Sequence, residues 1–300
     1  SPRSRWWSFG FKYKQFSSQP NNAGGISSNI VSTLFIDSKG VLWLGTLNGL
    51  DKFDASNESF VHYQFPIKNP MAPDNDFENT VYSIHESSNG NLWLGTLSGL
   101  VEFNRQAESY KFFSHHYDVY RYGWGNIIQI VEDASGKMWL ATSGELMRFD
   151  PKTFTYDYLR NDYLNQRSLS YNSISSLYID RTGILWVGTA GMGIDFYDPK
   201  VNRFSTFIKK SSSLTRVTGF SIRSILEESE DVVWLSTDVL FRWNRRTGEI
   251  KSYETDSYRP DDFGNTGAWA IIKSHDGKIW AATNEGVYCY DSQKNKIKQY

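Results

Sequence analysis

One short stretch of sequence occurs six times along this chain of 300 residues, and that repetition constrains the fold more than any other feature. The first copy, residues 41–54, reads VLWLGTLNGLDKFD. It contains an apolar run around Trp43, a small Gly-Thr pair, an Asn48-Gly49 turn and a second apolar run. Asn-Gly between two apolar runs predicts a β-hairpin. The later copies begin at residues 91, 137, 184, 232 and 278.

Each copy holds one tryptophan within its first apolar run, and successive tryptophans are separated by 50, 46, 47, 48 and 46 residues. Such a period, with four short strand-like segments in each repeat, is typical of β-propeller blades. A four-stranded sheet cannot bury both faces alone, but each face can pack on a neighbouring blade in a ring. We therefore assign the repeated tryptophans to blade packing and not to a ligand site: Trp43, Trp93, Trp139, Trp186, Trp234 and Trp280.

The sequence thus predicts an all-β fold, a β-propeller of four-stranded blades with six recognisable repeats. Residues 1–28 precede the propeller and are expected to hold one or two strands, because Lys12–Ser17 resembles the final strand of each later repeat. Two closures remain open. Six blades close with this segment added outside, or the segment belongs to a half-built seventh blade whose remainder lies beyond Tyr300, which we favour for the native protein. The propeller covers residues 29–300, with blades placed near residues 29–66, 79–114, 126–160, 172–209, 221–255 and 267–300.

Composition narrows the function classes. The aromatic share of 16% favours the pleated, half-buried surfaces of a sheet. The formal net charge is −1 and no basic stripe is present, so nucleic acid is not an expected partner. No stretch approaches the roughly 20 apolar residues of a membrane helix. Cys289 is the single cysteine, which excludes an intrachain disulfide, and its apolar surroundings predict a packed thiol.

Sequence motifs for metal binding and catalysis are missing. His115 and His116 are adjacent rather than at a ligand spacing, and no matching cluster accompanies them. There is no Gly-x-Ser-x-Gly elbow and no phosphate-binding glycine loop. We therefore expect no metal, no cofactor and no enzymatic activity. Two less favoured alternatives are a propeller glycosidase, which needs two opposed carboxylates, and a streptogramin-type lyase with one of these histidines as base.

Residues that break the repeat, in the loops that join one blade to the next, are the candidates for ligand binding. The most unusual loop, residues 115–125, reads HHYDVYRYGWG. Aromatic rings beside Arg, Asp and Asn suit a sugar, because rings stack on its C–H faces while polar groups pair with its hydroxyls. The alternative is that the loop packs on itself or on a partner domain. The candidate ligand-binding residues, expected on the face that carries the hairpin turns, are Tyr117, Tyr120, Arg121, Tyr122, Trp124, Tyr171, Arg216, Tyr258, Arg259 and Trp269.

The repeat resembles that of the two-component regulator propeller family. The shared pattern is Asn-x-apolar, then Asp-x-x-Gly-x-Leu-Trp-(Leu/Val)-Gly-Thr-x-x-Gly-Leu-x-x-Phe-Asp, and it is clearest in residues 29–54, 79–104 and 172–198. The resemblance extends over nearly the whole chain. The last two blades depart from it, since Ser236 and Ala282 replace the glycine before the threonine.

This resemblance implies a function. Propellers of the family form the extracytoplasmic sensor region of membrane-bound signalling proteins, often hybrid histidine kinases, and commonly sense carbohydrate fragments. The chain would then be periplasmic, as part of an inner-membrane protein, and would bind a small molecule or an oligosaccharide. Its further partners would be downstream domains of the same native protein, with a homodimer formed through the full-length protein. A protein-interaction scaffold is the main alternative.

Overall fold

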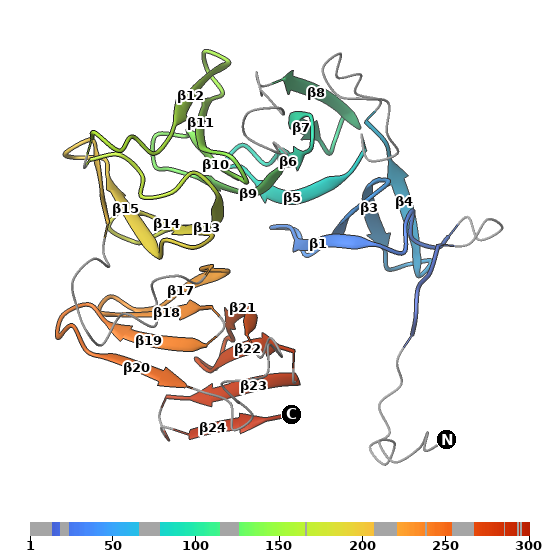
Figure 1. Ribbon diagram of the computed structural model, residues 1–300. Coiled ribbons are helices and arrows are strands. Elements are labelled where there is room, and N and C mark those ends of the chain that lie inside the picture. Colours follow the sequence, from blue (N-terminus) through green and yellow to red (C-terminus); the bar gives the residue numbers. More distant parts are fainter. Residues whose placement is uncertain are drawn as a thin grey trace.

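The computed structural model describes most of the chain, and in the part that it describes every regular element is a β-strand (Figure 1). The described residues are 14–18, 24–65, 79–114, 126–165, 167–206, 221–237, 239–253, 267–284, 286–292, 294 and 296–300.

The strands fall into six groups of four. Blades one and two hold β1 (Val31–Ile36), β2 (Leu42–Thr46), β3 (Gly49–Asp54), β4 (Ser59–Tyr63), β5 (Val81–Glu86), β6 (Leu92–Thr96), β7 (Gly99–Asn104) and β8 (Ser109–Ser114). Blades three and four hold β9 (Ile127–Glu132), β10 (Met138–Thr142), β11 (Leu146–Asp150), β12 (Thr155–Leu159), β13 (Ile174–Ile179), β14 (Leu185–Thr189), β15 (Ile194–Asp198) and β16 (Arg203–Thr206). Blades five and six hold β17 (Ser224–Ser229), β18 (Val232–Ser236), β19 (Leu240–Asn244), β20 (Ile250–Tyr253), β21 (Ala268–Lys273), β22 (Ile279–Thr283), β23 (Gly286–Asp291) and β24 (Lys296–Gln299).

Each group forms one antiparallel sheet in which the strands lie in chain order. The first strand of a blade lies nearest the centre, and β1, β5, β9, β13, β17 and β21 contact one another in that succession (Figure 1). The six sheets therefore surround a common axis, and the β-propeller predicted from the repeat is confirmed.

The repeated tryptophans lie between blades. In the first five blades the indole is at most 5% exposed, whereas that of Trp280 is half-buried. Trp43 illustrates the arrangement, because it packs with Val81 and Phe103 of the following blade. Burial of apolar surface contributes about 25 cal/mol per Å², so each indole joins two blades by removing a large ring from water.

In blades one, three and four an Asp-x-x-Gly turn before the tryptophan fixes the indole. The Asp37 carboxylate accepts hydrogen bonds from the backbone N–H groups of Lys39 and Val41 and from Trp43 Nε1, the last at 2.9 Å. Aspartates of blades three and four bind their tryptophans in the same way, and Glu228 does so in blade five. Blade two has Ser87 at this position, and Trp93 Nε1 is buried without an acceptor.

The Gly-Thr pair lets the next blade approach closely. A Cβ atom on Gly95 would lie 2.3 Å from the backbone oxygen of Ile127, at the start of the next inner strand. The following residue, Thr96, is buried and donates a 2.8 Å hydrogen bond to the carbonyl oxygen of Gly99 across the hairpin. The motif is thus explained by packing between blades and by hairpin closure.

The hairpin of blade one turns one residue earlier than the Asn-Gly pattern predicts. Thr46 pairs with Gly49, so the turn consists of Leu47 and Asn48. Gly49 instead begins β3 with a φ of 108°, and a Cβ atom there would lie 2.2 Å from the carbonyl oxygen of Tyr63. The prediction of an Asn48-Gly49 turn was therefore wrong by one position, because this glycine is needed for close approach of the fourth strand.

Candidate ligand-binding site

Where the structure describes them, residues of the connections between blades lie beside the hairpin turns. The Leu47 N–H donates to the carbonyl oxygen of Ile30, and the Ala190 N–H donates to that of Ser173. Ala190 also forms a β-bridge with Ser221, which belongs to the connection into blade five. We call this side the hairpin face.

A hollow of about 380 Å³ lies on the hairpin face near the propeller axis. Four blades contribute to it, because blades three to six each place the start of an inner strand or a hairpin turn there. Its lining combines four serines with apolar side chains, so it offers both C–H contacts and hydrogen bonds. The lining residues are Ile128, Ser143, Ser173, Ile174, Ser175, Ala190, Ser221, Arg223 and Trp269.

Trp269 supplies the aromatic surface that lines this hollow. Its side chain is 52% exposed, and the guanidinium carbon of Arg223 lies 4.5 Å from its ring centroid. The indole Nε1 donates a 2.5 Å hydrogen bond to the side-chain oxygen of Asn284, while an Arg223 Nη atom donates to the carbonyl oxygen of Thr237 at 2.8 Å. Backbone and side-chain contacts therefore hold a flat aromatic surface in place beside a cation.

The structure separates the sequence-predicted site residues into three groups. Trp269 lines the hollow. Tyr171 is 41% exposed but does not line the hollow. The remaining eight predicted residues lie outside the described part of the chain, so the arrangement of loop 115–125 stays a prediction: Tyr117, Tyr120, Arg121, Tyr122, Trp124, Arg216, Tyr258 and Arg259.

Sequence reasoning missed several lining residues. Arg223 and the serines at 143, 173, 175 and 221 are ordinary polar residues in sequence, without a motif around them. Their common feature is position, because each sits at a hairpin turn or immediately before or at the start of an inner strand. Alignment of the six repeats identifies these positions. A search for polar residues at these positions alone would have found Arg223.

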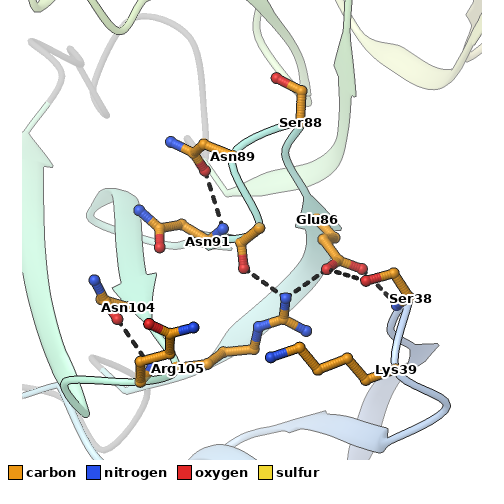
Figure 2. Close-up of a pocket in the computed structure, with 10 residues that line it drawn as sticks. Ser38, Lys39, Glu86, Ser88, Asn89, Asn91, Asn104 and Arg105 are labelled. Carbon is orange, nitrogen blue, oxygen red and sulfur yellow. Dashed lines mark hydrogen bonds and ion pairs between the residues drawn. The ribbon is translucent and has the colours of Figure 1, made fainter.

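A second hollow, of about 510 Å³, lies near the turns between the first and second strands of blades one and two, and Figure 2 shows its residues. Arg105 is its central side chain and is only 10% exposed. It donates to Asp37 and Glu86, each at 2.5 Å, and to the carbonyl oxygen of Gly90 at 2.6 Å. We call these groups the Arg105 cluster.

Electrostatics stabilise the Arg105 cluster. Burial by itself raises the pKa of Asp37 and of Glu86, but hydrogen bonds outweigh it and hold the pKa of each carboxyl below its usual value. For Asp37 these come from Trp43, backbone N–H groups and Arg105; for Glu86 they come from Ser38 and Arg105. Both carboxylates are therefore ionised at neutral pH.

The same cluster occurs at a second blade junction, which identifies it as structural. Arg245, one residue after β19, binds Asp180 at 2.8 Å and Glu227 at 3.1 Å, just as Arg105 follows β7. A ligand site would need unlike groups at a unique place, whereas this pair of clusters joins neighbouring blades. We therefore take the hollow around Trp269, not that of Figure 2, as the candidate ligand-binding site.

Two further features bear on function. Among the described residues, no group of three or more His, Cys, Asp and Glu side chains is placed to hold a metal ion. None of the described segments forms a helix of the length and hydropathy needed to cross a bilayer.

Comparison with known proteins supports the repeat assignment. The family model described as two component regulator propeller matches residues 25–48, 76–98 and 168–191, which begin blades one, two and four. A search of curated proteins found no match.

Solved structures show the same fold. The extracellular domain of BT4673 from B. thetaiotaomicron, described as a one component or hybrid two component system, has a TM-score of 0.69 at 22% identity. The alignment covers 96% of this chain and 35% of that one. Inactive virginiamycin B lyase from Staphylococcus aureus has a TM-score of 0.68 at 15% identity, with 95% and 87% of the two chains covered.

PorZ, a surface component of the type-IX secretion system of Porphyromonas gingivalis, has a TM-score of 0.66 at 16% identity, with 94% of this chain and 43% of PorZ covered. At these identities the likeness establishes architecture, and the chain spans about a third of the length of BT4673. The matched segments show which family of repeats blades one, two and four resemble. The chain is a β-propeller in which three segments match the two-component regulator propeller model.

Proposed function

We propose that the chain is the ligand-sensing propeller of an extracytoplasmic receptor region in a membrane-bound two-component regulator. The matched repeats support this proposal, as does the likeness to the extracellular domain of BT4673. Because the chain aligns with only 35% of that protein, the propeller would be one part of a longer receptor. Periplasmic placement, downstream domains and a homodimer of the full receptor belong to the same proposal.

The ligand that suits the hairpin-face hollow best is a carbohydrate. The observation that carries this proposal is the half-exposed, fixed indole of Trp269 beside Arg223 in a wall of serine hydroxyls. An indole face covers the C–H side of a pyranose, and hydroxyl and guanidinium groups pair with sugar hydroxyls. The hollow also lies where four blades meet, so one ligand would contact several blades at once.

Signalling would follow from differential affinity. A ligand favours one receptor arrangement only to the extent that it binds that arrangement more tightly. Contacts spread over blades three to six would make binding sensitive to small changes in blade orientation, and these changes would reach the domains that follow the propeller. The proposal requires no chemical step at the site.

A thermal-shift screen against oligosaccharides, with simple sugars, amino acids and divalent ions alongside, tests the proposal. A ligand that binds only the folded chain raises Tm by mass action. We expect an oligosaccharide to raise Tm and Trp269→Ala to abolish the shift. Tyr163→Ala is the matched control, because Tyr163 is an aromatic residue in a blade connection, is 97% exposed and does not line the hollow.

Other outcomes decide between the alternatives. A shift retained in Trp269→Ala but lost in a Tyr122→Ala and Trp124→Ala double variant would move the site to loop 115–125. Mass spectrometry of the recovered ligand separates binding from turnover, since a cleaved sugar would overturn the non-enzymatic assignment. A complete absence of small-molecule hits would favour a protein-interaction scaffold.

A further inference from the structure

The hollow of Figure 2 lies at the end of the strands opposite the hairpin face. Val81, the first residue of β5, pairs with Thr96 beside the hairpin turn, whereas Glu86, the last residue of β5, lines the hollow. The Arg105 cluster forms one wall, and its contacts recur at the junction of blades four and five. The side chains that complete the hollow differ from their equivalents in other repeats, so they are unlike groups at one place.

Lys39 is the first of these side chains. In blades three and four the equivalent residues, Ser135 and Thr182, donate their hydroxyl groups to the aspartate of their own turn, at 2.5 and 2.6 Å. Lys39 instead lines the hollow with an extended side chain (Figure 2). Its ammonium group has no ion-pair partner among the described residues. The hollow therefore contains a cation that the fold does not use.

Two asparagines bring further N–H donors to the same hollow. The side-chain oxygen of Asn104 accepts the backbone N–H groups two and three positions later, at 2.9 and 3.0 Å. That of Asn89 accepts the Ser87 hydroxyl at 2.7 Å and the Asn91 N–H at 3.0 Å. Because the oxygens are engaged, the orientation of each amide is fixed and its NH2 group is the end that remains. Neither NH2 group has a partner in the part of the chain that the structure describes.

Asn104 also removes a negative charge that most repeats place at this position. Its side chain forms a turn that a carboxylate forms equally well, since Asp54 and Asp198 accept the backbone N–H two positions later at 2.9 Å. In blade two the second carboxylate oxygen is replaced by a donor. The equivalent residue is aspartate in blades one, three, four and six: Asp54, Asp150, Asp198 and Asp291.

The carboxylates near the hollow are already satisfied. Glu86 accepts from Arg105 and from both the hydroxyl and the backbone N–H of Ser38, and Asp37 accepts from Arg105, Trp43 and two backbone N–H groups. These two carboxylates balance the charges of Arg105 and Lys39, but Lys39 makes no close pair with either. One unpaired cation beside several N–H donors suits a group with one negative charge and several acceptor oxygens.

We propose that this hollow binds a small organic molecule through a singly charged oxyanion, a carboxylate or a sulfate ester. Lys39 pairs with the charge, and the NH2 groups of Asn89 and Asn104 donate to the oxygens. The volume of about 510 Å³ falls in the range of small-molecule sites, so the carrier of the anion fits as well. The inference rests on observations other than those behind the carbohydrate proposal, and it holds whether or not the hollow beside Trp269 binds a sugar.

NMR of the 300-residue chain tests the inference, with glucuronate, glucose 6-sulfate and glucose as probes. The three share one neutral ring, so differences between them report the charged group. We expect an acidic probe to shift the side-chain NH2 signals of Asn89 and Asn104, which are assigned by their loss in Asn89→Asp and Asn104→Asp, and glucose to leave them unchanged. The Kd should rise several-fold between about 50 and about 500 mM NaCl, because salt screens the pairing with Lys39.

Asn104→Asp is the decisive variant, because it introduces the residue that most repeats carry and keeps the acceptor of the turn. We expect the Kd of the acidic probe to rise about tenfold or more, since a donor is replaced by a negative charge, with Tm nearly unchanged. Asn244→Asp is the matched control: Asn244 accepts the same two N–H groups in blade five, each at 3.0 Å, and does not line the hollow. Lys39→Gln should also weaken binding, whereas Lys200→Gln, in an exposed turn of blade four, should not.

The outcomes separate the two sources of the anion and the two hollows. Binding of glucuronate alone supports a carboxylate ligand, and binding of glucose 6-sulfate alone supports a sulfate ester. Equal binding of glucose, or an unchanged Kd in both Asn104→Asp and Lys39→Gln, would overturn the inference. Trp269→Ala, which tests the carbohydrate proposal, should leave these NH2 shifts intact. Loss of the shifts in that variant would place the acidic probe in the other hollow and would equally overturn the inference.

Discussion

Trp234 and Trp280 occupy the same position of the same repeat and have different surroundings. Trp234 is fully buried between blades five and six, with Tyr253 and Tyr290 against it. Trp280 is half-buried, since no described blade follows it. The difference teaches that this residue is buried by the neighbouring blade and not by its own. Stability in this fold is therefore mainly a sum of junctions, as expected for a repeat protein.

The largest expected effect contrasts an internal tryptophan with a terminal one. Trp139→Ala should lower the free energy of unfolding by about 3–5 kcal/mol, because it leaves a cavity between blades three and four. Trp280→Ala should cost about 1–2 kcal/mol, since much of its ring is already in contact with water. Urea unfolding of both variants measures the difference, and equal losses would contradict the assignment of burial to the following blade.

The second prediction concerns the Arg105 cluster. Arg105→Met should lower stability by about 3 kcal/mol, because two nearly buried carboxylates lose their cation. Arg148→Met is the matched control: its partner Asp157 is more than half exposed, and such surface pairs are worth about 0.2–1 kcal/mol. Urea midpoints of the two variants at neutral pH provide the comparison, and a small loss in Arg105→Met would show that the cluster does not join the blades.

Acid should weaken the same junctions. The folded-state pKa values of Asp37 and Glu86 lie below their ordinary values of 3.8 and 4.5. A lowered folded pKa means that the contribution is fully present above the unfolded value and is lost as pH falls through the folded value. Tm should therefore decline from about pH 5 downward. The decline should be shallower in Arg105→Met, and parallel profiles would remove this cluster as a cause.

A smaller effect is expected at the glycine that precedes the threonine. Gly95→Ala should cost about 1–3 kcal/mol, because the new methyl group would overlap the backbone of the next inner strand. At the same motif position in blade six, Ala282 is exposed and tolerates its Cβ atom. Ala282→Gly should change stability by less than about 1 kcal/mol. Chemical denaturation of the pair tests whether close approach, and not the motif itself, requires glycine.

The smallest predicted effect is a gain. Ser87→Asp should raise stability by about 1 kcal/mol, because it supplies the acceptor that Trp93 Nε1 lacks. Asp133 shows that an aspartate at this position bonds its tryptophan, at 3.0 Å. Ser87→Ala is the control and should not raise stability. A destabilised Ser87→Asp protein would indicate that local crowding outweighs the hydrogen bond.

The candidate site was only partly accessible from sequence. Trp269 was predicted as a ligand-binding residue and lines the hollow, whereas Tyr171, chosen by the same reasoning, does not. Both are exposed aromatic residues in or next to a blade connection, so composition could not separate them. What separates them is their place relative to the inner strand: Trp269 lies within β21, whereas Tyr171 precedes β13. Arg223 was missed for the same reason, since nothing in its neighbours marks it as an axial residue.

The sequence by itself determined the repeat, the four-stranded blade and the propeller. It could do so because each blade repeats an apolar alternation and a tryptophan at a fixed place, and five of the six blades carry a glycine turn three residues before that tryptophan. Local propensity and side-chain periodicity are properties of short segments, and six copies make them unambiguous.

The tertiary structure decided what the pattern could not contain. Equivalent residues such as Leu34 and Leu177 differ in exposure because blade three covers Leu177, whereas no described blade covers Leu34. Likewise, Arg105 and Asp37 lie 68 positions apart and meet only because blades one and two pack together. Contacts between blades depend on which repeats become neighbours and on which repeats lie at the ends of the series. A local pattern that is the same in every repeat does not contain that information.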